Sequence, residues 1–195
     1  VMQLGFETYL NLIYEDRDRF WGLMAKNEAF CAEWANAQLE AGATAICYFD
    51  PVSSPEMVPR ELYAETGHQA GLRTIAAING PVATHLASAR SLGIADLVAQ
   101  TQTAVIAFST TEDPAEAKRV SAGKLSLLGN LDGITMRTWS PQQTEDTVKR
   151  LIAKAGPGGG FILADNHGEI HFSTPEAVLD QISAAVYRWG TYPLD

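Results

Sequence analysis

The chain has 195 residues, of which 46% are hydrophobic and 19% charged, and its formal net charge at pH 7 is −9. That length and composition are ordinary for one globular domain with a hydrophobic core. The acidic charge argues against a nucleic-acid partner, which requires a basic face. No apolar stretch approaches the roughly 18 residues that span a bilayer, and no secretory signal is visible. We therefore expect a cytoplasmic protein without a membrane partner.

Apolar runs of strand length alternate with helical patterns along the chain. A helix is expected from about Asn27 to Glu40 and is followed by Gly42. Ser140-Pro141 and Thr174-Pro175 each place a capping residue before a proline, which predicts helices over 140–156 and 174–190. The predicted strands cover 45–49, 74–78, 104–108, 125–128 and 161–164, and Val1 to Leu4 is a candidate sixth. Uninterrupted apolar runs of this length indicate strands that are buried on both faces.

The alternation of strands and helices predicts an α/β fold with right-handed parallel crossovers. No Gly-rich phosphate loop follows a strand, which disfavours a doubly wound sheet. Polar residues instead follow almost every predicted strand, as in a (β/α)8 barrel of the TIM type, which carries its functional side chains there. A complete barrel of this type usually needs about 250 residues. We therefore expect residues 1–195 to form a single partial barrel of the C-terminal five or six strand–helix units, with an N-terminal portion absent.

The two cysteines lie in different patterns. Cys31 falls in a helical pattern and Cys47 in a predicted strand, and neither has a CxxC spacing. We expect both to be small buried hydrophobic residues.

Several ordered segments resemble the uroporphyrinogen decarboxylase superfamily. QLEAGATAICYFDP resembles its EAGAD passage, in which an aspartate ends a barrel strand, and LSLLGNLD resembles its GNLDP strand end. The segment from Gly156 to Val186 resembles the final strand, the GHG loop and the last helix. DPVSSPEM, from Asp50 to Met57, is similar to the DPVASPEM of the corrinoid-dependent methyltransferase branch. The resemblance implies a methyltransferase that moves a methyl group between a small methylated donor or a thiol acceptor and a corrinoid protein.

The chain departs from the zinc methyltransferases of this branch in its metal ligands. Their HxCG motif corresponds, on this resemblance, to Ala77-Ile78-Asn79-Gly80, and their later cysteine corresponds to His167. The usual His/Cys/Cys set for a tetrahedral zinc ion is therefore absent. The expected cofactor is a corrinoid carried by a partner protein, and zinc is an option that the usual ligands do not support. The absent thiolates suit a methoxylated donor, and hence O-demethylation, at least as well as a thiol.

Asp50 and His167 are the expected catalytic residues and the candidate metal ligands. Both follow predicted strands, where a carboxylate or an imidazole serves as a ligand, a base or a substrate contact. The alternatives are a turn cap for Asp50 and a hydrogen bond to a neighbouring carboxylate for His167. His171 is a weaker candidate, and His85 is expected to have a surface or packing role.

The expected substrate-binding residues are Asn79, Asn130, Asp132 and Asn166. An amide in such a position donates to a carboxylate or methoxy oxygen of the substrate. Asn79 alternatively caps the turn before Gly80-Pro81, and Asp132 alternatively caps the next segment.

Two other functions stay open at this stage. One is a cofactor-free decarboxylase of uroporphyrinogen-like carboxylates, which would use His167 and an aspartate from the absent portion. The other is a non-catalytic barrel that binds a partner or a corrinoid. The sequence does not indicate the oligomeric state.

Overall fold

The computed structural model describes residues 3–194. They include one parallel five-stranded sheet whose strands lie in chain order. In the register of the sheet, Ile46 lies beside Val82 at one edge and Leu131 lies beside Asp165 at the other. The strands are β1 (Ile46–Phe49), β2 (Val82–His85), β3 (Val105–Ala107), β4 (Ser126–Leu131) and β5 (Phe161–Asp165). The predicted parallel α/β architecture, a section of a (β/α)8 barrel, is confirmed.

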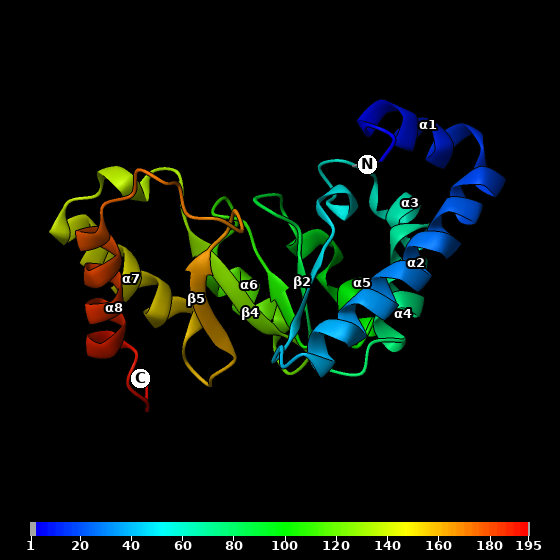
Figure 1. Ribbon diagram of the computed structural model, residues 1–195. Coiled ribbons are helices and arrows are strands. Elements are labelled where there is room, and N and C mark those ends of the chain that lie inside the picture. Colours follow the sequence, from blue (N-terminus) through cyan, green and yellow to red (C-terminus); the bar gives the residue numbers. More distant parts are fainter. Residues whose placement is uncertain (1–2, 195) are drawn as a thin grey trace.

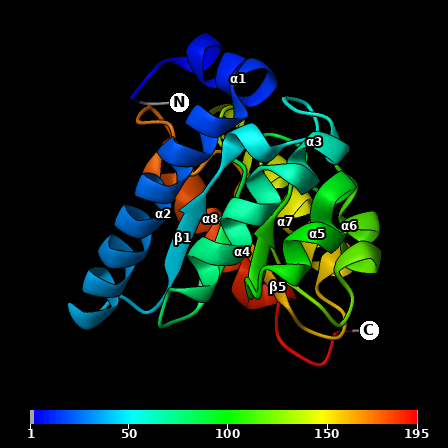
Figure 2. The same cartoon turned by 90° about the vertical axis from the view of Figure 1, so that its right-hand side faces the viewer.

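Helices connect the strands and cover one face of the sheet. In Figure 1, α2 lies beyond β1 at one end of the curved sheet, and α7 and α8 lie at the other end. In Figure 2, α4, α5 and α6 lie beside one another on the helix-covered face. The α-helices are α1 (Phe6–Glu15), α2 (Arg17–Glu40), α3 (Arg60–Glu65), α4 (Gly67–Ala76), α5 (Ala95–Gln100), α6 (Pro114–Ser121), α7 (Pro141–Ala155) and α8 (Glu176–Trp189), and the short 3-10 helices are η1 (Pro51–Ser53), η2 (Leu92–Ile94) and η3 (Met136–Thr138).

The hydrophobic core lies between this face of the sheet and the helices. In β1, Ile46 packs with Ala35 of α2 and Ile75 of α4. Successive side chains of a strand point to opposite faces. Phe49 therefore points away from the helices, toward the interior of a barrel, and it is 58% exposed.

The last strand repeats this arrangement. Phe161 and Leu163 of β5 pack against Leu151 of α7 and Ala185 of α8. Ile162, between them, points to the opposite face and is 47% exposed. The inner face of the sheet therefore exposes apolar side chains at its two edge strands.

Local capping decides where the long helices begin. Ser140 and Gln143 form a capping box at the start of α7, which confirms the predicted helix there. The predicted cap at Thr174 is wrong, because α8 begins at Glu176 after Pro175 and receives no side-chain cap. Asp16 caps α2, which therefore starts before the predicted Asn27.

The strand predicted over 74–78 is wrong. This segment is the last turn of α4 and the turn after it. A short apolar run does not distinguish a strand from a buried helix segment, and Gly80-Pro81 is also a typical stop signal for a helix. The strand follows that signal, as β2.

Three smaller expectations have different outcomes. Val1 and Met2 of the candidate sixth strand lie outside the described residues, and Gln3 and Leu4 form a turn. Cys31 and Cys47 are exposed rather than buried. Cys47 is exposed because its side chain lies on the inner face of β1, which the helices do not cover.

A membrane-spanning helix must be both long and predominantly apolar. Among residues 3–194, no helix combines that length with that composition.

Candidate functional site

The carboxyl ends of the parallel strands meet at one edge of the sheet, and five side chains gather there. We call Phe49, His85, Asp132, Asp165 and His167 the mouth cluster. The rings of Phe49 and His85 stack with their centroids 5.8 Å apart. A methyl group added to Gly168 would lie 3.9 Å from both rings. The loop after β5 therefore closes over the ends of β1 and β2.

Asp165 holds that loop in place. Its Oδ1 accepts hydrogen bonds from the backbone N–H groups of His167 (2.7 Å) and Gly168 (2.9 Å). Burial lowers the pKa of the His85 imidazole, and the charge of Asp165 opposes this effect. The two residues therefore interact across the mouth, from β2 to β5.

Asp132 lies beside His167 from the neighbouring strand end. Its Oδ1 accepts the N–H groups of Ile134 (3.0 Å) and Thr135 (3.1 Å), so it caps the turn before η3. Burial by itself raises the pKa of Asp132, but the hydrogen bonds from Thr135 and the nearby His167 outweigh it, and the net pKa is lowered. Asp132 thus has the predicted capping role and also faces the predicted His167.

Asn166 and Asn130 lie behind the mouth rather than in it. Asn166 is fully buried. Its amide orients so that Oδ1 accepts from Thr110 N–H (3.1 Å) while Nδ2 donates to Leu131 O (3.3 Å) and His167 Nδ1 (2.9 Å). Asn130 Nδ2 donates to the carbonyl oxygens of Ser109 (2.8 Å) and Glu112 (3.2 Å). Both predicted substrate-binding amides are therefore used to join loops.

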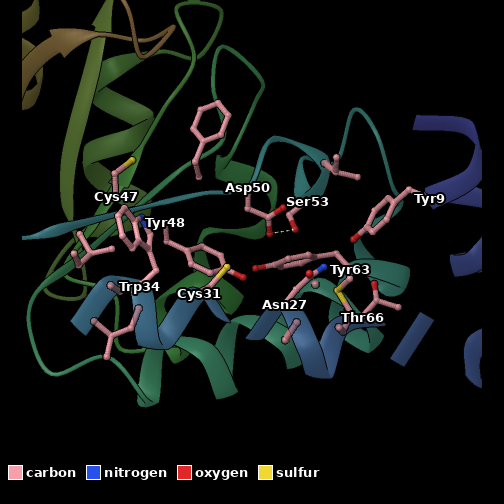
Figure 3. A pocket seen from close by; sticks show the side chains of 18 of the residues that line it. Tyr9, Asn27, Cys31, Trp34, Cys47, Tyr48, Asp50, Ser53, Tyr63 and Thr66 are labelled. Carbon is pink, nitrogen blue, oxygen red and sulfur yellow. Dashed lines mark hydrogen bonds between the residues drawn. The ribbon is translucent and has the colours of Figure 1, made fainter. Parts of the chain in front are cut away.

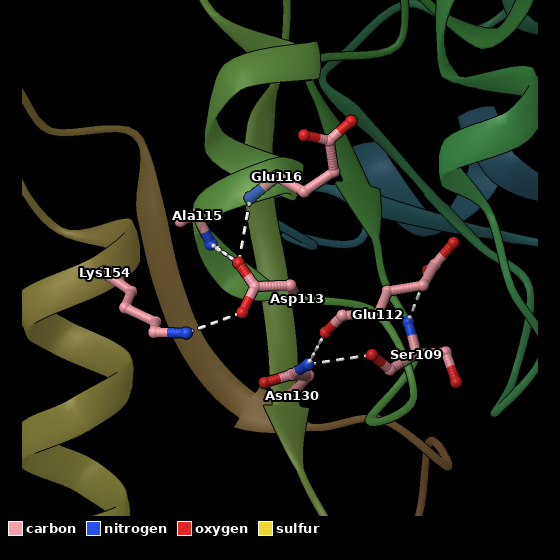
Figure 4. A network of polar contacts seen from close by, with 7 residues as sticks. All are labelled: Ser109, Glu112, Asp113, Ala115, Glu116, Asn130 and Lys154. Carbon is pink, nitrogen blue, oxygen red and sulfur yellow. Dashed lines mark hydrogen bonds and ion pairs between the residues drawn. The ribbon is translucent and has the colours of Figure 1, made fainter.

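Glu112 is the centre of this buried network. Its carboxylate accepts the N–H groups of Ser91 (3.0 Å), Leu92 (2.9 Å) and Ser109 (2.9 Å), and the residue is only 6% exposed. Figure 4 shows how Asn130 of β4 extends the network and how Asp113, which caps α6, pairs with Lys154. We call Ser91, Ser109, Glu112, Asn130 and Asn166 the loop girdle, because together they connect the loops after β2, β3 and β5 to one another and to β4.

Asp50 lies in a separate pocket, on the helix-covered side of β1. The pocket has a volume of about 400 Å³ and is lined by residues of α1, α2, η1, α3, α4 and β1. In Figure 3 the hydrogen bond drawn among these residues joins the Ser53 hydroxyl to the Asp50 carboxylate. Burial raises the pKa of Asp50, and the hydrogen bond from Ser53 lowers it in part.

Tyrosines surround this carboxylate. Burial and the charge of Asp50 raise the pKa of Tyr9 to about 12 and also raise the pKa values of Tyr48 and Tyr63. The contacts of Asp50 and His167 fall in different clusters. The structure therefore does not bring the two predicted catalytic residues together.

Asn79 lies at the opposite end of the sheet from the mouth. It precedes β2, and its backbone N–H donates to Asn36 Oδ1 of α2 (2.8 Å). The expectation that Asn79 follows a strand is wrong, because residues 74–78 are not a strand. The misplaced strand also aligned the HxCG motif of the zinc methyltransferases with the wrong residues. The real strand ends with His85, and Leu86-Ala87-Ser88 follow it. A histidine is therefore present in an HxCG-like position, and Ala87 replaces the cysteine.

The described residues do not fit a metal site by themselves. Among residues 3–194, no group of three or more His, Cys, Asp or Glu side chains is arranged to hold a metal ion. The predicted pair of His167 and Asp50 is divided between the mouth and the Asp50 pocket.

His85 and Glu112 are the residues that the sequence reasoning missed. His85 has a signal, since it ends the short run Val82 to His85 after the helix stop at Gly80-Pro81. Glu112 has none, because its partners Ser91 and Leu92 lie in another loop, about 20 residues away in sequence.

With this geometry established, comparison with known proteins identifies the family. The model of the uroporphyrinogen decarboxylase (URO-D) family matches residues 2–189. The chain is 26% identical over 191 residues to a uroporphyrinogen decarboxylase of Actinobacillus pleuropneumoniae serotype 5b, covering 95% of this chain and 53% of the relative. It is 27% identical over 189 residues to one of Escherichia coli O157:H7, covering 94% of this chain and 52% of the relative.

A solved structure, a methyltransferase from Methanosarcina mazei, has the same fold. It superposes with a TM-score of 0.84 at 18% identity, over 95% of this chain and 54% of the other. The chain thus spans about half the length of the relatives that it matches. By its sequence and its barrel section, this chain belongs to the uroporphyrinogen decarboxylase family.

Proposed function

We propose that this chain is the part of a methyltransferase that binds and orients the small substrate, with a corrinoid protein docked over the mouth of the barrel. The observation that carries the proposal is the chemistry of the mouth cluster. Its polar members are two imidazoles and two carboxylates, and it contains no guanidinium or ammonium group. Such a site favours a small substrate of low charge over a polycarboxylate.

In this proposal His85 and His167 contact the substrate, and Phe49 provides an apolar wall beside it. The corrinoid of the partner would supply the cobalt chemistry when bound. The chain's own contribution is to position the substrate and to hold protons at the imidazole nitrogens. Since the described residues do not fit a zinc site, the proposal includes no step through zinc. A cytoplasmic location is part of the same proposal.

The second candidate is decarboxylation of a uroporphyrinogen-like carboxylate. It is favoured by the names of the relatives, which are uroporphyrinogen decarboxylases at 24–27% identity. The cationic groups that its substrate requires would come from outside the described residues.

The test uses the full-length protein with three matched histidine variants. We expect transfer of a methyl group from a methoxylated aromatic to a reduced corrinoid, or from methylcobalamin to a thiol. His85→Gln and His167→Gln should each lower kcat/KM by about 100-fold, the scale of a lost proton donor or substrate contact. His171→Gln should leave it unchanged, because His171 is exposed and accepts only from Ser173 of its own turn. Consumption of uroporphyrinogen without methyl transfer would replace this proposal by the second candidate.

A further inference from the structure

The Asp50 pocket has a polar wall at the end of β1. The backbone N–H of Asp50 donates to His85 O (2.9 Å), so the residue continues the pairing of β1 with β2. Tyr48, two residues before it, therefore points to the same side. Tyr63 of α3 and Tyr9 of α1 line the same pocket. Burial and then the charge of Asp50 raise the pKa of each tyrosine, which places all three phenol groups near one carboxylate.

These phenol groups have unused hydrogen-bonding capacity. Among residues 3–194, the three tyrosine hydroxyl groups make no hydrogen bond to the protein, and Asp50 accepts a side-chain hydrogen bond only from Ser53 (Figure 3). The hydroxyl oxygens are not sealed inside the protein, so they are open to the pocket. Tyr63 as a whole is nevertheless only 4% exposed. Because buried polar groups are normally satisfied, this set is expected to receive a bound molecule.

Close packing holds the polar wall in place. Gly67 begins α4 beside Ser53 and Tyr63. A Cβ atom added to Gly67 would lie 2.6 Å from Ser53 Oγ and 2.9 Å from Tyr63 Cδ2, closer than real Cβ contacts. The two side chains therefore occupy the space that any other residue would need. A wall fixed in this way is arranged before a ligand arrives, which lowers the entropic cost of binding.

The charge of the pocket favours a cation. Among residues 3–194, Asp50 is the only charged side chain that lines the pocket, and it belongs to none of the ion pairs between described residues. A carboxylate removed from water without a counter-charge is costly. Tyrosine and tryptophan rings have negative faces, which also attract cations. A positively charged ligand supplies the missing partner, whereas an anion is repelled.

The rest of the pocket is largely apolar. Ile13, Met24 and Val58 line it as buried residues, and Trp34 of α2 lines it while 59% exposed. The volume of about 400 Å³ falls in the usual range of sites for small molecules. The pocket is therefore suited to a molecule with a charged head group and a hydrocarbon body.

We propose that the Asp50 pocket binds a small primary amine in its protonated form, with the ammonium group against Asp50 and the tyrosine hydroxyl groups. An ammonium group has three N–H donors and no acceptor. The carboxylate of Asp50 and two phenol oxygens accept all three. The hydrocarbon body packs on the apolar residues and the ring of Trp34. The site is separate from the mouth cluster, and this inference does not depend on methyl transfer.

The first experiment compares two probes of the same shape on the full-length protein. Phenethylamine is protonated near pH 7.5, about three units below the pKa of an alkyl amine such as lysine, and phenethyl alcohol is uncharged. By titration calorimetry the amine should bind about 10- to 100-fold more tightly, because hydrogen bonds to a charged group are stronger than neutral ones. Equal affinities, or binding of neither probe, would overturn the inference. Binding of the amine to residues 1–195 alone but not to the full-length protein would overturn it as well, because another part of the chain would then occupy the pocket.

A methylated probe tests the hydrogen bonds of the head group. The N,N,N-trimethyl derivative of phenethylamine keeps the positive charge but has no N–H donor. It should bind roughly tenfold more weakly than phenethylamine. Equal or tighter binding would show a site for the charge alone and would refute a primary amine as the ligand class.

Two substitutions locate the head group. Asp50→Asn should remove most of the preference for the amine over the alcohol, while Asp180→Asn, at an exposed position of α8, should leave it unchanged. Tyr48→Phe removes one hydroxyl oxygen and should weaken amine binding about fivefold. Its matched control is Tyr187→Phe, because Tyr187 is 83% exposed on α8.

Either substitution by itself decides the position of the ammonium group. A preference retained in folded Asp50→Asn, or an unchanged amine affinity in folded Tyr48→Phe, would overturn the proposed position. If Asp50→Asn does not fold, the two tyrosine variants and the probe series still give the answer.

Discussion

At the scale of single residues, Asp50 illustrates how burial changes the pKa of a carboxylate. It follows β1, as the sequence predicts, but its side chain turns to the helix-covered side and accepts from Ser53 among three tyrosines. Burial disfavours its charged form and raises its pKa, and the hydrogen bond from Ser53 offsets only part of this effect. The folded state therefore binds the proton of Asp50 more tightly than the unfolded chain does.

The corresponding prediction concerns the pH dependence of stability. Since the pKa of Asp50 is raised on folding, its contribution is fully present below the ordinary value of 3.8 and is lost as the pH rises through the raised pKa. Asn carries no charge, so Asp50→Asn should lose less stability than the wild type between about pH 4 and pH 7. Urea unfolding midpoints across this range measure the difference. The control is Asp180→Asn, an exposed position on α8. Parallel pH profiles for wild type and Asp50→Asn would contradict the prediction.

At the scale of elements, the loop girdle makes the strand ends a single unit. Glu112 joins the loop after β2 to the loop after β3, Asn130 continues to β4, and Asn166 joins Thr110 to the last loop. A carboxylate that receives several backbone N–H groups satisfies buried donors that have no other partner. The positions of His85 and His167 therefore depend on residues that do not themselves face the mouth.

The prediction at this scale is the effect of Glu112→Gln. The glutamine has the same shape, but its NH2 group must face a backbone N–H that needs an acceptor. We expect a loss of about 1–3 kcal/mol in the free energy of unfolding, the usual cost of a buried unsatisfied donor. Urea unfolding measures it, and hydrogen exchange should show faster exchange at Ser91 and Leu92. Glu116→Gln is the matched control on α6, where loss of the exposed ion pair with Arg119 should leave the free energy of unfolding nearly unchanged.

At the scale of the whole molecule, the described chain is an open section of a barrel. Helices cover one face of its sheet, and Phe49 and Ile162 are exposed on the other. The relatives are about twice as long. We expect a chain of their length to cover this inner face with further strands.

A pair of isoleucine substitutions tests the two faces. Ile162→Thr should reduce binding of a hydrophobic dye to this 195-residue chain and change its stability by less than about 1 kcal/mol. Ile106→Thr, at a residue that is 0% exposed on the other face, should cost roughly 2–5 kcal/mol. Dye fluorescence and urea unfolding together give both readouts. Similar losses of stability for both variants would mean that Ile162 is covered in solution.

Much of the element order could be predicted, because continuous apolar runs and capping residues are local signals. The strands near 45–49, 104–108, 125–128 and 161–164 and the start of α7 follow from such signals. The failure at 74–78 has a local cause as well. An apolar run of five residues satisfies a strand and a buried helical turn equally. Because of that one error, Asn79 was assigned to the wrong end of the sheet, and His85 was not recognised as a strand-end residue.

The sequence by itself determined the family, the parallel barrel section and the presence of polar residues after most strands, since each depends on residues near one another in the chain. Only the tertiary structure decided which of these polar residues meet. It separated Asp50 from His167, put Asn130 and Asn166 behind the mouth and brought His85 within range of the charge of Asp165. The physical reason is that side-chain direction and hydrogen-bond partners depend on packing between distant loops. A strand-end position fixes the edge of the sheet but not the face to which a side chain turns.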